Sequence, residues 1–189
     1  MAEIKFTVMV KSNSEHPGFI RSYGMFWDRA EVDWAPGAGN ANQYRLLGRS
    51  GAFNPKLRVC DFRSQRGIYV LYDDHGPVYV GLARDQDIGN RLREHTRNHR
   101  RHTWDRFSWF GFRRVLEGRE PDGTRRLGQV PAKLLSNSES TIGDIEALLI
   151  QCLGTYRTGN RQQMRFVSAD HWTQIRQDEW DTYRNRVRW

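Results

Sequence analysis

Hydrophobic and polar residues alternate in several short stretches of the chain, as they do in β-strands with one buried face. Every second position of residues 3–10 is apolar, which predicts a strand near the N-terminus. Two further stretches, 67–72 and 78–82, are β-branched and aromatic and are separated by the turn-forming sequence DDHGP. This arrangement predicts a β-hairpin, and the aromatic segment 104–115 predicts a third strand.

Helical segments are predicted before and after the third strand. Asp85 or Asp87 can cap a helix that runs to about Arg100, since an aspartate there accepts hydrogen bonds from free backbone N–H groups. Residues 139–153 have the length and composition of a second helix. From Ser168 onward, large apolar side chains fall near one helical face, which predicts a third helix: Trp172, Ile175, Trp180, Tyr183 and Val187.

Charge indicates the kind of partner. The chain of 189 residues carries 30 Lys and Arg against 22 Asp and Glu, a net charge of +8, and all but four of these cations are Arg. Guanidinium groups form planar, bidentate hydrogen bonds with phosphate. Because the sequence shows no amphipathic membrane anchor, we expect a nucleic acid and not a membrane as the partner.

Composition argues against several other classes of protein. With 38% hydrophobic residues the chain can bury a core, so we do not expect global disorder. No apolar run approaches the roughly 20 residues of a membrane-spanning helix, and the N-terminus lacks the pattern of a signal peptide. Cys60 and Cys152 are too few for a disulfide framework or a cysteine-based zinc site. These features predict a cytoplasmic protein.

The predicted hairpin contains two glycine-bearing triplets, GIY at 67–69 and YVG at 79–81. This pair resembles the defining motif of the GIY-YIG nuclease family, with Val in place of Ile in the second triplet. The resemblance covers roughly residues 62–167, and its motif pattern is closest to the small restriction-endonuclease branch. Six positions match the functional residues of that branch: Tyr69, Tyr79, Arg91, His95, Glu146 and Asn160.

The resemblance implies an α+β fold in which a small antiparallel sheet, the hairpin plus a third strand, is flanked by helices. Residues 1–61 would then be an N-terminal extension of unassigned role, residues 62–167 the GIY-YIG-like nuclease domain and 168–189 a C-terminal helix. It also implies a divalent-metal-dependent endonuclease that hydrolyses phosphodiester bonds in DNA, in restriction or phage defence. A homodimer is one way for such a site to cut both strands.

Four of the six residues have a chemical reason to meet. The hydroxyls of Tyr69 and Tyr79 can converge on a scissile phosphate, although both are also ordinary strand aromatics. Arg91 and His95 lie at i and i+4 and therefore share one side of their helix with apolar residues. Arg91 can neutralise charge that grows on phosphorus, and His95 can relay a proton or orient a Tyr hydroxyl. The alternatives are a surface cation and a structural histidine.

Glu146 and Asn160 complete the match. Helical periodicity places Glu146 within an apolar arc that includes Ile145 and Leu149, while Asp144 falls on the side expected to be exposed. A buried carboxylate needs a cation, which is either Arg91 in a salt bridge or, as the resemblance implies, a bound Mg²⁺ or Mn²⁺. The resemblance assigns Asn160 to phosphate contact, and the alternative is a polar turn residue.

Further cations are candidates for substrate binding. The first helix carries several, and the segment 113–138, which we expect to be an exposed excursion, carries others; the four selected are Arg93, Arg97, Arg113 and Arg114. Two other functions remain open. One is a structure-directed repair or RNA-cleaving nuclease, with DNA favoured over RNA. The other is a nucleic-acid-binding module without catalysis.

Overall fold

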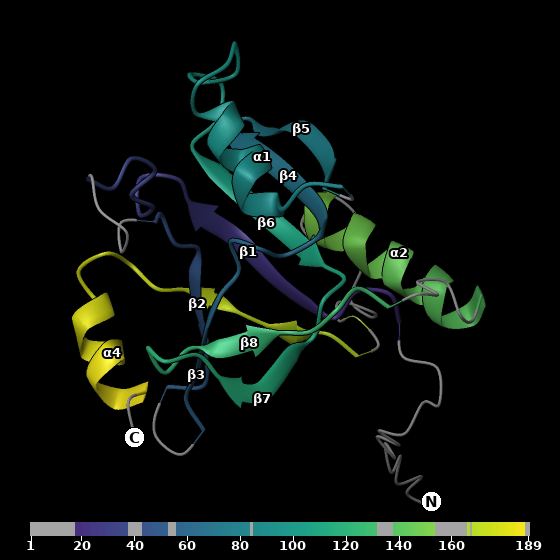
Figure 1. Cartoon of the computed structure of the whole chain (residues 1–189). Helices are drawn as coiled ribbons and strands as arrows, with labels where there is room; N and C mark the ends of the chain where they lie inside the picture. Colours follow the sequence, from purple (N-terminus) through teal and green to yellow (C-terminus); the bar gives the residue numbers. More distant parts are fainter. Residues whose placement is uncertain are drawn as a thin grey trace, which may run out of the picture.

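The computed structural model is α+β, with two mixed five-stranded sheets and three helices among the residues it describes (Figure 1). These residues are 18–37, 43–52, 56–83, 85–131, 138–153, 166 and 168–187, except that the side chains of 138–140, 142, 143, 146 and 153 are not included. The strand predicted at 3–10 and the candidate Asn160 lie outside them. In the described part of the chain, no helix is long and apolar enough to cross a membrane.

The first sheet, sheet A, contains the predicted hairpin and third strand at one side. Its order is β5 (Gly76–Ala83), β4 (Gly67–Asp73), β6 (Arg106–Gly111), β1 (Ser22–Asp28) and β9 (Asp170–His171). Strands β5, β4 and β6 pair antiparallel as expected, but β1 and β9 extend the sheet from three strands to five. One strand of the N-terminal segment, β1, therefore belongs to the same sheet as the hairpin.

The second sheet, sheet B, has the order β10 (Thr173–Gln174), β2 (Leu47–Ser50), β3 (Arg58–Asp61), β8 (Arg125–Leu127) and β7 (Val115–Arg119). The segment expected as an exposed excursion at 113–138 contains the β7–β8 pair in its first half, and its described positions are mostly exposed or half-buried. Val115 pairs with Leu127 across that hairpin, and both pack against the main core. One apolar cross-strand pair thus anchors a segment that is otherwise rich in arginine.

The helices differ from their predicted bounds. Helix α1 covers Ile88–His95 and ends sooner than expected, with Thr96 as its C-cap. Helix α2 covers Ser138–Leu153, close to the prediction. Helix α4 covers Trp180–Val187, so the helix expected from Ser168 is wrong over its first half. That half forms β9 and β10 instead, because the fully buried Trp172 between them packs where the two sheets meet.

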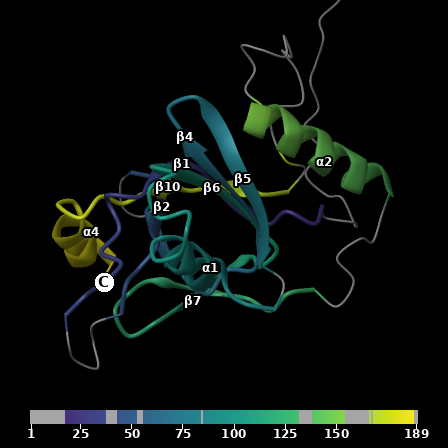
Figure 2. The same ribbon diagram turned by 90° about the horizontal axis from the view of Figure 1, so that it is seen from above.

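Helices α1 and α2 cover opposite faces of sheet A, as the view from above shows (Figure 2). Alternate residues of β4 divide between the two cores. Tyr69 and Leu71 belong to the cluster that includes Leu92 of α1, whereas Val70 belongs to the cluster that includes Ala147 of α2. Helix α4 packs on sheet B through a third cluster. The face of sheet A that carries Tyr69 is thus the α1 face.

The buried face of α2 is not the one that periodicity predicts. Ile145 and Leu149 are about half exposed, whereas Asp144, expected at the surface, is completely buried. The carboxylate of Asp144 accepts a hydrogen bond from the backbone N–H of Ile20 at 3.1 Å. A buried carboxylate is stable where backbone donors satisfy it, so this contact to the N-terminal segment turns a polar residue inward. The periodicity argument that singled out Glu146 therefore used a face that is partly exposed.

Candidate active site

Tyr69 lies at the centre of the candidate site. It stands on β4, its side chain is completely buried, and its Oη lies 2.9 Å from Nε2 of His95. Its cross-strand partner is Gly81, and a Cβ added there would overlap the Tyr69 ring. Gly67 has a φ of +156°, and a Cβ there would overlap the carbonyl oxygen of Phe110. The glycines of both triplets are therefore required by close packing around Tyr69 and its strand.

Tyr79 forms the outer wall of the site. Its half-buried ring lies 6.0 Å from the Tyr69 ring and 5.0 Å from the His95 ring, measured between centroids. The guanidinium carbon of Arg100 lies 4.2 Å from the centre of the Tyr79 ring, a cation–π contact. Arg100, which follows α1 in a turn, thereby fixes Tyr79 and brings positive charge to the site.

Asn98 determines which nitrogen of His95 carries the proton. Its Oδ1 accepts a hydrogen bond from the backbone N–H of Arg100 at 2.9 Å, so its Nδ2 is the atom that lies 3.2 Å from Nδ1 of His95. An amide Nδ2 can only donate, and Nδ1 must therefore be the acceptor. The proton of the neutral ring is then on Nε2, which donates to Tyr69 Oη.

The charge state of His95 agrees with this assignment. Burial lowers the pKa of His95, and the nearby positive charges of Arg91 and Arg100 lower it further. The ring is consequently neutral at pH 7. His95 holds Tyr69 by donation and is not poised to accept its proton. Of the two roles open from the sequence, the geometry supports orientation.

Arg91 joins the cluster from helix α1. Its guanidinium hydrogen-bonds with Tyr69 and forms an ion pair with Glu94, Nη1 to Oε2, at 2.9 Å. Burial, with a contribution from Tyr79, raises the pKa of Tyr69 to about 12, against the lowering effect of Arg91. Tyr69 is thus a neutral phenol at pH 7.

The outer side of Arg91 is accessible. Its side chain is 35% exposed, and it lines an open pocket of about 510 Å³ together with Leu82, Asp85 and Gln86. A phosphate that enters this pocket meets a guanidinium already positioned by Tyr69 and Glu94. Arg91 and His95, at i and i+4 on α1, thus both lie beside Tyr69.

The other candidate cations occupy different places. Arg93 is half-buried, donates from Nε to the carbonyl of Trp34 at 3.1 Å and lies 4.9 Å from the centre of the Tyr44 ring. Arg97 is exposed on the turn after α1. Arg113 and Arg114 follow β6, where the side chain of Gln65 binds the backbone N–H and C=O of Arg113 at 3.0 and 2.9 Å.

The described donors do not fit a resident metal ion. No group of three or more His, Cys, Asp and Glu residues among them is placed to hold one. Of the two carboxylates near Arg91, Glu94 is paired with it and Asp85 lines the same pocket. The side chain of Glu146, the expected ligand, lies outside the described residues, and its helix packs on the face of sheet A opposite Tyr69.

Sequence reasoning did not find Asn98 or Glu94. A signal was present for both, because Asn98 follows His95 by three residues and Glu94 follows Arg91 by three, the spacing of neighbours on a helix. Arg100 was recognised only as part of a basic helix, not as a partner of Tyr79.

Comparison of the chain with known protein families, with curated proteins and with solved structures finds no match.

Proposed function

We propose that this chain is a GIY-YIG-type endonuclease that hydrolyses phosphodiester bonds in DNA, with restriction or phage defence as its role. The observation that carries the proposal is the 2.9 Å contact between Tyr69 Oη and His95 Nε2, at a point that Tyr79 and Arg91 also reach. The net charge of +8 supports a polyanionic substrate.

The chemistry follows from the charges at this point. Arg91 binds non-bridging oxygens of the phosphate and stabilises the charge that grows on them as water attacks phosphorus and the bond to the leaving oxygen breaks. The attacking water gives its proton to solvent, and the leaving oxygen takes a proton from solvent. Tyr69 is completely buried and hydrogen-bonds with His95, Arg91 and Tyr79, so its role is to hold Arg91 and Tyr79 in position beside the phosphate. With a pKa of about 12, Tyr69 is a poor base.

Cleavage assays on supercoiled plasmid, branched DNA and RNA, each with Mg²⁺ and with EDTA, test this function. The informative variant is Arg91→Ala, and the matched control is Arg184→Ala, which removes the same charge from an exposed position on α4. We expect plasmid cleavage, a loss of roughly 100-fold or more in rate for Arg91→Ala, and an unchanged rate for Arg184→Ala. Cleavage of RNA or branched DNA alone would assign the site to the other nuclease classes.

One observation favours a second candidate, a nucleic-acid-binding module without catalysis. Helix α2, which carries the expected metal ligand, packs on the face of sheet A opposite the tyrosines. If none of the three substrates is cut while the protein retards DNA in a gel, this second function holds. Equal retention by the wild-type protein and Arg91→Ala would then show that Arg91 has no special role in binding.

A further inference from the structure

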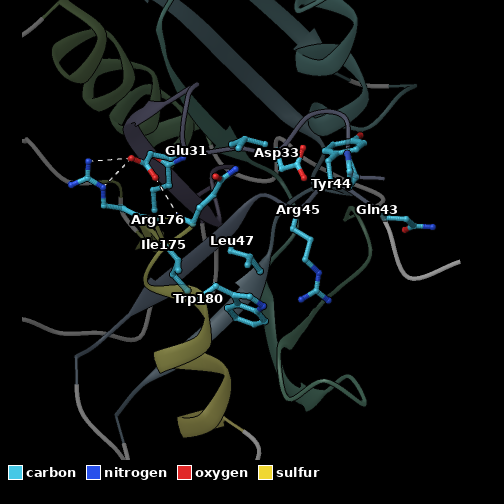
Figure 3. A pocket seen from close by; sticks show the side chains of 13 residues that line it. Glu31, Asp33, Gln43, Tyr44, Arg45, Leu47, Ile175, Arg176 and Trp180 are labelled. Atoms are coloured by element: carbon cyan, nitrogen blue, oxygen red, sulfur yellow. Dashed lines mark hydrogen bonds and ion pairs between the residues drawn. The ribbon is translucent and has the colours of Figure 1, made fainter. Parts of the chain in front are cut away.

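A second pocket, of about 180 Å³, shares no lining residue with the pocket at Arg91. It lies between the segment after β1, the start of β2 and the chain that leads into α4 (Figure 3). Leu47, Ile175 and the indole of Trp180 form an apolar side, and Asp33 and Tyr44 lie across from Trp180. Pockets for drug-sized ligands are typically about 300–1,000 Å³, so this one has room for a single ring system.

Most charged groups of this pocket are already paired. Glu31 accepts from Arg176 at 3.1 Å and from the backbone N–H of Gln177 at 3.2 Å. Arg45 is bound to Asp122, and its guanidinium lies 5.4 Å from the centre of the Trp180 ring.

Asp33 is the exception in the described part of the chain. It is exposed, its Oδ1 accepts one hydrogen bond from the backbone N–H of Ala35 at 3.2 Å, and no cation there pairs with it. Asp33 therefore keeps acceptor capacity for a ligand.

This lining favours a planar ring with an N–H donor. Glu31, Arg45 and Arg176 are already paired, so Asp33 is the acceptor left for the ligand, and its charge disfavours an anionic ring. A planar ring can lie against the indole of Trp180 and the apolar side chains beside it. The carboxylate of Asp33 can accept from an exocyclic amine, as carboxylates do from cytosine N4.

The rim of the pocket suits a phosphate backbone. Tyr44 donates from its hydroxyl to Oδ1 of Asn90 on α1 at 2.8 Å, which ties this wall to the helix that carries Arg91. The guanidinium groups of Arg93 and Arg63 lie 4.9 and 5.9 Å from the centre of the Tyr44 ring. Phosphates near Tyr44 would meet positive charge, while the base enters the neutral interior.

We infer that this pocket binds one unpaired cytosine, with its exocyclic amine at Asp33, of the nucleic acid on which the chain acts. The inference rests on the proposed function in that the ligand is a nucleic acid, but it does not depend on cleavage. Base selection would then occur at Trp180 and Asp33, separately from the chemistry at Tyr69.

The test compares the binding of single-stranded oligo(dC) and oligo(dT) of equal length at one salt concentration. Fluorescence anisotropy of the oligonucleotide and tryptophan fluorescence of the protein both measure this binding. Both probes carry the same phosphates, so the electrostatic part of binding cancels. We expect the wild-type protein to bind oligo(dC) roughly tenfold more tightly, the discrimination typical of one base contact. Asp33→Asn should remove the preference. The control is Asp178→Asn, which changes an exposed carboxylate near Trp180 that does not line the pocket, and it should keep the preference.

Equal affinity of the wild-type protein for the two oligonucleotides, or an unchanged preference in Asp33→Asn, would overturn the inference. Arginine amide serves as a probe for an arginine side chain of a protein partner. Saturable binding of arginine amide that competes with neither oligonucleotide would also overturn the inference, because it would indicate a protein partner. Plasmid cleavage by the same proteins separates the two proposals. Cleavage without base preference contradicts the pocket alone, and base preference without cleavage contradicts the catalytic function alone.

Discussion

Asn98 holds His95 as the tautomer that donates to Tyr69. The amide oxygen of Asn98 is occupied by the backbone N–H of Arg100, so its nitrogen lies against Nδ1 of His95, 3.2 Å away. Nε2 of His95, 2.9 Å from Tyr69 Oη, therefore carries the ring proton. A turn residue outside the motif thus determines the role of a motif histidine.

The first prediction concerns this tautomer. Asn98→Asp places an acceptor at Nδ1, which moves the ring proton to Nδ1 or charges the ring. We expect ¹⁵N NMR of the wild-type protein to show a protonated Nε2 and an unprotonated Nδ1 for His95 at pH 7.5, and Asn98→Asp to show a protonated Nδ1. The His95→Gln spectrum assigns the resonance. An Nδ1-protonated ring in the wild-type protein would contradict the assignment.

The pH dependence of stability tests the burial of His95. Burial lowers the pKa of His95 below its ordinary value of 6.5, so between the folded pKa and 6.5 the unfolded state binds more protons. The contribution of this residue is complete above pH 6.5 and is lost as the pH falls through 6.5 toward the folded pKa. Urea titrations at pH 7.5 and 5.0 should show a smaller loss of unfolding free energy for His95→Gln than for the wild-type protein.

His75 supplies the control for this experiment, because it is 94% exposed in the β4–β5 turn. His75→Gln should lose as much stability between the two pH values as the wild-type protein does. Burial also lowers the pKa of His171, so some dependence on pH should remain in His95→Gln. Parallel curves for His95→Gln and the wild-type protein would show that His95 titrates alike in both states.

Gly81→Ala should displace Tyr69. A methyl group at Gly81 overlaps the Tyr69 ring, so the ring must move away from His95 or the strands must separate. We expect a destabilisation of about 1–3 kcal/mol and loss of cleavage. Gly118→Ala, where the nearest atom is 3.7 Å from the new Cβ, is the control and should change neither property. Denaturant titration and plasmid cleavage measure the two effects.

Arg91→Lys should restore little of the activity that Arg91→Ala loses. Arg91 contacts Tyr69 and Glu94 and is proposed to bind phosphate, and a single ammonium group cannot reproduce the fork of a guanidinium. Single-turnover rates at saturating DNA separate this effect from affinity. Full activity of Arg91→Lys would mean that only its charge matters, and a change confined to affinity would make Arg91 a docking residue.

Glu146→Gln tests the metal that the family resemblance implies. If Glu146 holds Mg²⁺ or Mn²⁺ during catalysis, this variant should lose metal-dependent cleavage but keep DNA binding, because backbone affinity comes from arginine. Glu139→Gln on the same helix should cleave normally. Retained Mg²⁺-dependent cutting by Glu146→Gln would remove this residue from the site and agree with the position of α2 on the opposite face.

Sequence patterns were sufficient to predict elements that form within one short segment of the chain. The alternation and turn residues at 67–82 predict the β4–β5 hairpin, and the i, i+4 spacing predicts that Arg91 and His95 share one side of α1. The two glycine triplets also direct attention to Tyr69, although only the structure shows that Gly81 makes room for its ring. These predictions hold because hydrogen bonds and side-chain periodicity along one segment determine them.

The rest depended on contacts between distant segments. Asp144 is buried on α2 because Ile20 supplies a donor 124 residues earlier. The segment around Trp172 forms β9 and β10 in place of the expected helix because both sheets pack around that side chain. Such partners leave no periodic trace in the sequence of the segment that they reshape. The sequence alone therefore determined the hairpin, the presence of helix α1 and the placement of Arg91 and His95 on one side of that helix. Only the tertiary structure decided the tautomer of His95, the face that α2 covers and the second pocket, because each requires side chains from separate elements to meet.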